Sequence, residues 1–169
     1  RIGVLKPDVG VAGGFERVVD RVEAALRRDG HRVERVTVPV PGRAGPTCGV
    51  PVTDEVWDRA PEYFRYMAGV EAFDEVPTDR FDVVVSTQPP SFCHRHPRHL
   101  SLFFHHQRIF YELEDLWVDG GFAPDAGLHR RAGERVRSLD AERLAEVRWF
   151  AAGSETVRRR LARANGIDR

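Results

Sequence analysis

The feature that most constrains this chain is a strand, a glycine-rich loop, a helix and a second strand at its start. Residues 2–5 form a short apolar run of extended character. Apolar residues then recur at helical spacing over residues 15–26, and Gly30 is placed to end that helix in a left-handed cap. Residues 33–38 alternate valine with polar residues, which predicts the second strand. Such a unit is right-handed and packs its helix on a parallel sheet.

Charged residues are predicted to fill the outward face of this first helix. Glu23 and Arg27 have the i, i+4 spacing of a favourable ion pair on that face. Glu16 falls in the first turn, where a carboxylate stabilises the helix N-terminus. That local role competes with a role for Glu16 in binding.

The rest of the chain continues to alternate between helices and strands. Residues 54–73 are rich in aromatic residues and predict a helix interrupted near Pro61. The remaining expected segments are loops at 39–51 and 119–133, strands at 81–87, 100–104 and 149–152, and helices at 139–147 and 154–165. In the last of these helices, Val157, Leu161 and Ala164 are expected to face inward. The sequence therefore predicts an α/β fold, a three-layer Rossmann-like domain with a mostly parallel sheet.

Composition narrows the class of protein further. A length of 169 residues suits a single domain, residues 1–169. The 26 basic residues balance the 26 acidic ones, which gives no whole-chain argument for binding nucleic acid. The two cysteines, Cys48 and Cys93, are too few for a disulfide framework, so we expect a cytoplasmic protein.

Ligands of parallel α/β sheets bind beyond the carboxyl ends of the strands. Polar, turn-rich segments follow three of the expected strands there, at residues 7–14, 86–91 and 105–108. In the first segment, Gly13 and Gly14 precede a helix, where backbone amides attract phosphate. The spacing fits neither GxGxxG nor a P-loop, so a tight turn is the alternative.

Histidines gather in one stretch of the chain. Five of the seven lie between residues 94 and 106, next to Cys93. They are His94, His96, His99, His105 and His106. Their spacing matches no standard zinc motif, so we expect no metal, although a metal-dependent hydrolase stays a third hypothesis. We interpret the first three as solvated loop residues.

His105 differs because it ends a buried strand, where ligands bind. An imidazole there can donate a hydrogen bond and titrate near neutrality. His106 is the second candidate. The arginines of the last helix predict a solvated face, a domain contact or a peripheral membrane contact, without the aromatic platform of a single-strand binder. These arginines are Arg158, Arg159, Arg160 and Arg163.

Four stretches of the chain carry a family resemblance. They are residues 13–33 (GGFERVVDRVEAALRRDGHRV), 81–90 (FDVVVSTQPP), 100–113 (LSLFFHHQRIFYEL) and 149–168 (WFAAGSETVRRRLARANGID). They resemble the N-terminal domain of family 4 glycosyltransferases, retaining enzymes of GT-B fold. They follow the order of the family and span nearly the whole chain, and the last stretch is the most specific.

The resemblance implies transfer of a sugar from a nucleotide-sugar donor to an acceptor hydroxyl, without a metal or other cofactor. In the family the N-terminal domain mostly binds the acceptor, which here could be a carbohydrate, a lipid-linked or a small molecule. Gly13 and Gly14 match the loop beside the donor diphosphate, and His105 matches the histidine near the reaction centre. Further acceptor or donor contacts are expected from Glu16, Arg17, Ser86, Thr87, Gln88, His106 and Arg108.

The family's C-terminal domain is absent from these 169 residues. That domain carries an Arg/Lys pair on the diphosphate and a Glu-x7-Glu motif that binds the donor. The resemblance therefore implies that this chain is inactive without its own C-terminal domain, and that it acts in the cytoplasm or at the inner face of the membrane. The second hypothesis is a stand-alone, non-catalytic α/β domain that binds a small anionic ligand.

Overall fold

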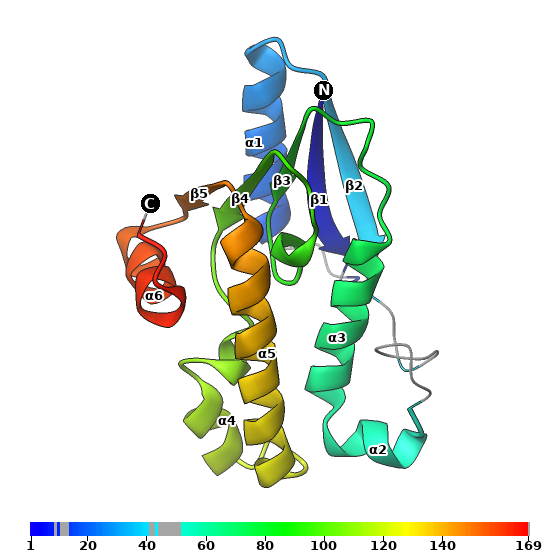
Figure 1. Ribbon diagram of the computed structural model, residues 1–169, viewed down its shortest axis with the longest axis vertical. Coiled ribbons are helices and arrows are strands. Elements are labelled where there is room, and N and C mark those ends of the chain that lie inside the picture. Colours follow the sequence, from blue (N-terminus) through cyan, green and yellow to red (C-terminus); the bar gives the residue numbers. More distant parts are fainter. Residues whose placement is uncertain (9, 11–13, 41–42, 44–51, 169) are drawn as a thin grey trace.

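Five parallel strands form one sheet in the order β2-β1-β3-β4-β5, with helices on both faces (Figure 1). This computed structural model describes residues 1–8, 10, 14–40, 43 and 52–168. The strands are β1 (Ile2–Asp8), β2 (Val33–Pro39), β3 (Val83–Ser86), β4 (His99–Phe103) and β5 (Trp149–Ala152). The helices are α1 (Gly14–Arg28), α2 (Asp54–Arg59), α3 (Pro61–Asp74), α4 (Glu114–Asp119), α5 (Ala126–Glu146) and α6 (Glu155–Asn165), with short 3-10 turns η1 (Ser91–Cys93) and η2 (Arg108–Phe110). The predicted α/β class and parallel sheet are confirmed.

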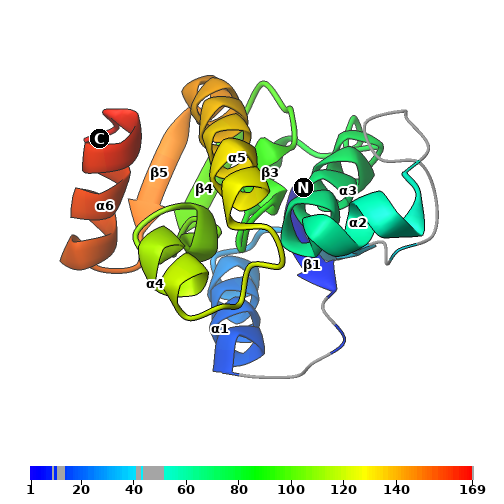
Figure 2. The same cartoon turned by 90° about the horizontal axis from the view of Figure 1, so that it is seen from below.

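The two faces of the sheet are covered by different helices, as Figure 2 shows. On one face, Val19 of α1 packs against Ile2, Val4 and Val85. On the other face, helices α3, α5 and α6 enclose a larger cluster that includes Phe103 of β4. The first helix and the later helices therefore lie on opposite sides of β1, as right-handed crossovers require.

Local signals predicted several element ends correctly. Gly30 adopts a φ of 88° after α1, and Gly166 adopts a φ of 68° at the end of α6. Ser154 caps α6, because its Oγ accepts a hydrogen bond from the backbone N–H of Val157 at 3.3 Å. Pro61 opens α3 and separates it from α2, as predicted.

The prediction of a loop over residues 119–133 is wrong from residue 126 onward. Helix α5 begins there, because the side chain of Asp125 accepts a hydrogen bond from the N–H of Leu128 at 2.8 Å. Gly133 lies inside the helix, and a Cβ there would collide with the carboxylate of Glu114. The glycine leaves room beside α5 for the carboxylate of Glu114, the first residue of α4.

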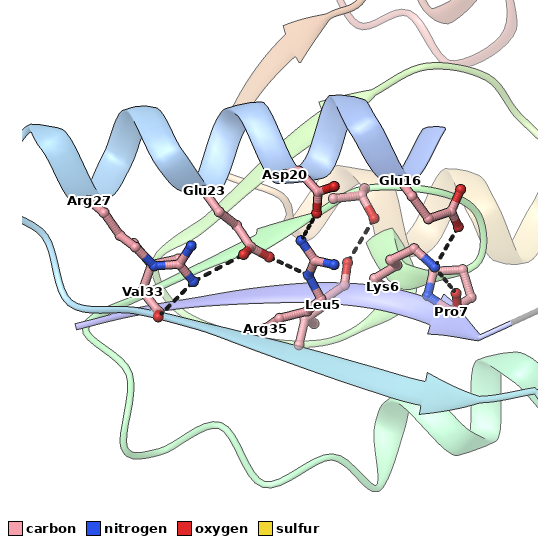
Figure 3. Close-up of polar contacts among 10 residues, drawn as sticks. Leu5, Lys6, Pro7, Glu16, Asp20, Glu23, Arg27, Val33 and Arg35 are labelled. Atoms are coloured by element: carbon pink, nitrogen blue, oxygen red, sulfur yellow. Dashed lines mark hydrogen bonds and ion pairs between the residues drawn. The ribbon is translucent and has the colours of Figure 1, made fainter. Parts of the chain in front are cut away.

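The prediction that Glu23 faces outward is also wrong. Its side chain is buried between α1 and the sheet, 2.5 Å from Nε of Arg35 on β2 (Figure 3). The predicted ion pair with Arg27 does form, at 3.0 Å.

The prediction that Ala164 of α6 faces inward is wrong, because this residue is exposed. None of the described helices is long and apolar enough to cross a bilayer.

Candidate functional site

The candidate site lies at the carboxyl edge of the sheet, where β1 and β3 are neighbours. From β1 the chain turns into α1 on one face, whereas the chain after β3 continues on the opposite face. A reversal of this kind leaves a crevice beyond the strand ends, where α/β proteins bind ligands. The hydroxyl of Thr87 donates to the carbonyl of Leu5 at 2.8 Å, which ties the two strand ends together.

An ion pair links the end of β1 to the first turn of α1 (Figure 3). The Nζ of Lys6 lies 3.0 Å from Oε1 of Glu16 and donates to the carbonyl of Pro7 at 3.1 Å. The Lys6 side chain is 8% exposed, so this cation is held in the interior near the strand end. Our sequence analysis did not single out Lys6, although it is the only lysine of the chain.

Gly14 is the first residue of α1 and is exposed. Its φ is outside the left-handed region, and a Cβ added there would have no atom within 4 Å. Neither the backbone nor the packing therefore requires glycine at this position. Gly13 lies outside the described residues. Arg17 is exposed on α1, with no hydrogen-bond partner in the described part of the chain.

The chain after β3 is held by its own hydrogen bonds. Ser86 is fully buried, with its Oγ 2.8 Å from Nε2 of His99. The N–H of Thr87 donates to Oγ of Ser91, at 2.9 Å. Ser86 and Thr87 are thus committed to the interior. The Oε1 of Gln88 is buried and has no hydrogen-bond partner within the described residues, so it is an unsatisfied acceptor beside the end of β3.

A small cavity of about 120 Å³ lies beside this turn. The peptide bond between Pro89 and Pro90 is cis, and both prolines line the cavity. The other lining residues are Val40, Glu62, Arg65, Tyr66 and Gln107. The cavity therefore joins the segments that follow β2, β3 and β4.

The two adjacent histidines after β4 differ in exposure. His105 is half-buried, and its Nδ1 donates to the backbone carbonyl of His106 at 2.7 Å. Because a carbonyl only accepts, Nδ1 carries a proton, and in the neutral ring Nε2 is then an acceptor. That nitrogen has no hydrogen-bond partner within the described residues. A substrate hydroxyl could donate to it.

His106 is buried and used within the fold. Its Nε2 lies 2.7 Å from Oδ1 of Asn165, and its ring stacks on Tyr111 with centroids 4.0 Å apart. Burial lowers the pKa of His106, against the raising effect of the Asn165 hydrogen bond. Arg108 is exposed and pairs with Glu112 at 2.7 Å.

An aromatic contact brings the start of α1 to the end of β4. The rings of Phe15 and Phe104 meet edge to face, with centroids 4.9 Å apart. Gly14 and His105 are the chain neighbours of these two rings. Two of the predicted site residues, more than 90 positions apart in sequence, therefore flank one contact.

The prediction that His94 and His99 are solvated is wrong. His94 is 5% exposed, with Nδ1 2.7 Å from the carbonyl of Phe73 and Nε2 2.8 Å from Oγ1 of Thr78. His99 is 1% exposed, and burial lowers its pKa to about 3. His96, at the surface, accepts from the N–H of Arg98 at 3.1 Å. The buried rings are neutral and join loops to the core.

The described part of the chain offers neither a cluster of metal ligands nor an activated thiol. No group of three or more His, Cys, Asp or Glu residues there is placed to hold a metal ion. Cys93 is fully buried, and burial raises the pKa of its thiol well above the usual value.

Searches of protein-family models, curated proteins and solved structures found no match to this chain.

Proposed function

We propose that this chain is the acceptor-binding domain of a retaining glycosyltransferase. The enzyme would transfer a sugar from a nucleotide-sugar donor to an acceptor hydroxyl, and would act when the chain is joined to a C-terminal nucleotide-binding domain. The proposal is supported by the sequence resemblance together with one structural observation, the contact of Phe15 with Phe104. That contact holds the glycine-led helix N-terminus beside the strand end that carries His105.

Each part of this edge has a role in the proposed reaction. The N–H groups at the start of α1 would face the donor phosphates, where negative charge builds on the leaving group. The free Nε2 of His105 would accept a hydrogen bond from a sugar or acceptor hydroxyl. Gln88, the chain neighbour of the two prolines that line the small cavity, would lie close to the bound acceptor.

The test is a transfer assay on the full-length gene product with UDP-, GDP- and ADP-sugars as donors. We expect product that retains the anomeric configuration of the donor, with and without EDTA. The variant His105→Ala should lower kcat/KM at least tenfold, about 1.4 kcal/mol in the transition state. His31→Ala is the matched control, because His31 is exposed in the turn between α1 and β2.

Unchanged turnover in His105→Ala would remove that residue from the site. Loss of transfer on EDTA treatment would contradict the metal-independent mechanism. A gene product that binds a small anion but transfers no sugar from any donor would support the non-catalytic α/β domain instead.

A further inference from the structure

A larger cavity lies on the face of the sheet that α5 and α6 cover, beside the segment that follows β4. Its volume is about 540 Å³, within the range of small-molecule sites. The lining residues come from α5, α6 and the chain after β4, whose places in the fold Figure 1 shows. Its lining consists of His106, Tyr111, Glu112, Arg137, Arg160, Arg163 and Ala164.

The lining carries an excess of positive charge. Three guanidinium groups and one carboxylate line the cavity. His106 is not counted as a cation, because burial lowers the pKa of its imidazole. Arg163 has no ion-pair partner among the described residues. Arg160 lies 3.2 Å from Oε1 of Glu112, but Arg108 occupies the same oxygen at 2.7 Å. The carboxylate is therefore shared, and the arginines keep unused N–H donors.

Arg137 is held in place from α5. Its Nη1 donates to the carbonyl of Phe110 at 2.6 Å and lies 3.2 Å from Oε1 of Glu114. These contacts fix the guanidinium before any ligand arrives, so less side-chain entropy is lost on binding.

The aromatic wall of the cavity is also preorganised. The hydroxyl of Tyr111 donates to Oδ2 of Asp140 at 2.7 Å, and the His106 ring stacks on the Tyr111 ring. His106 is anchored in turn by Asn165. The wall therefore offers a rigid ring surface to the non-ionic part of a ligand, while the arginines face its charge.

We propose that this cavity binds a small organic phosphate. Planar guanidinium forks pair with phosphate oxygens in two-point contacts, which an isolated ammonium cannot do. A cavity of this volume holds a phosphate together with a compact organic body, which the rings and Ala164 would contact. The inference does not depend on the proposed transfer reaction, because it rests on α5, α6 and the segment from His106 to Glu112 and uses none of Gly14, Gln88 and His105.

The test is calorimetric titration of the chain with inorganic pyrophosphate and with glucose 6-phosphate at constant ionic strength. We expect saturable one-to-one binding, with at least one of the two phosphates binding more tightly than sulfate. Arg160→Gln and Arg163→Gln should each raise Kd about tenfold or more. Arg159→Gln is the matched control, because this side chain on the same helix is 75% exposed, pairs with Glu155 and is not part of the lining.

Ring signals of His106 and Tyr111 in NMR spectra report on the same site. They should shift on titration in the parent chain and in Arg159→Gln, and Arg160→Lys should retain part of the binding because it keeps the charge. The proposal fails if neither phosphate binds, or if the control variant loses as much affinity as the two cavity variants. It also fails if RNA or anionic vesicles bind at this site while both small phosphates do not.

Discussion

The two faces of the sheet are held by different interactions. Between α1 and the sheet, the buried carboxylate of Glu23 meets guanidinium groups of Arg27 and Arg35 (Figure 3). Within the opposite core, the buried carboxyl group of Asp140 accepts hydrogen bonds from the hydroxyl groups of Tyr66 at 2.6 Å and Tyr111 at 2.7 Å.

The comparison shows how each environment treats a buried acid. Glu23 is compensated by cations that reach it from the protein surface. Asp140 has phenol donors, and burial raises its pKa from 3.8 to about 7 despite the lowering effect of the two hydrogen bonds. One face is therefore sensitive to charge removal, and the other to packing and pH.

The largest expected effect comes from packing on the α5 face. Phe103 is fully buried in the large cluster, so Phe103→Ala should lower the free energy of unfolding by about 3–5 kcal/mol. Urea unfolding followed by circular dichroism measures this change. Phe122→Ala is the control, because Phe122 is 62% exposed and its loss should cost under about 0.5 kcal/mol. Equal losses in the two variants would show that this core is not tightly packed.

The second prediction concerns pH. The unfolded chain ionises Asp140 near pH 3.8, whereas the folded chain keeps the proton up to about pH 7. Folding thus takes up a proton in this window, and the contribution of Asp140 to stability is greatest at low pH and falls as pH rises to 7. The stability difference, parent minus Asp140→Asn, should fall by about 2–4 kcal/mol between pH 4 and pH 8.

The quantity to compare is the difference in unfolding free energy between the parent chain and Asp140→Asn at each pH. Burial lowers the pKa of His99 to about 3, so its contribution is present above pH 6.5 and is lost on acidification. That opposite trend is common to parent and variant and cancels in the subtraction. Urea unfolding at pH 4, 6 and 8 supplies the data, and a pH-independent difference would mean that Asp140 ionises normally in the fold.

A smaller effect is expected on the α1 face. Glu23→Gln removes the charge from a buried group and leaves Arg35 with one acidic partner, which should cost about 1–3 kcal/mol. Asp20→Asn removes the other partner of Arg35, but the Asp20 side chain is 60% exposed, so the expected cost is below about 1 kcal/mol. Thermal and urea unfolding of both variants test the ratio. If Asp20→Asn costs as much as Glu23→Gln, burial is not what distinguishes these acids.

The smallest stability change is expected at Gly14. Because a Cβ there meets no atom within 4 Å, Gly14→Ala should leave stability unchanged or raise it by about 0.5–1 kcal/mol. In the transfer assay on the proposed full-length enzyme the same variant should weaken donor use, since the added methyl group would stand where we propose that the donor phosphate approaches the backbone. Normal donor affinity in Gly14→Ala would reduce the glycine to a turn residue.

Local chemistry made much of the fold predictable. The alternation of strands and an amphipathic helix predicted β1, α1 and β2. The residues that mark helix boundaries, such as Gly30 after α1 and Ser154 before α6, act within one turn of their position. Helix α5 was underestimated because its N-cap, Asp125, lies inside the stretch 119–133 that was assigned to a loop.

The candidate sites were predictable only in part. Parallel topology alone sends residues 7–14, 86–91 and 105–108 to one edge. Burial of polar groups was not predictable, since Glu23 and His94 find partners at Arg35 and Phe73 that no local pattern specifies. The basic cavity was missed because its arginines come from two helices and join only when α5 and α6 pack on the same face.

The two histidines after β4, His105 and His106, show most clearly what the sequence determined and what the tertiary structure decided. The sequence by itself determined that two histidines follow a buried strand at the ligand-binding edge of a parallel sheet. It could not determine which imidazole is held by partners within the fold. The tertiary structure decided this, because Asn165 at the end of α6 and the ring of Tyr111 bind His106 and draw it into the interior. Hydrogen bonding and stacking with these partners satisfy one imidazole, and the neighbouring His105 keeps its Nε2 available.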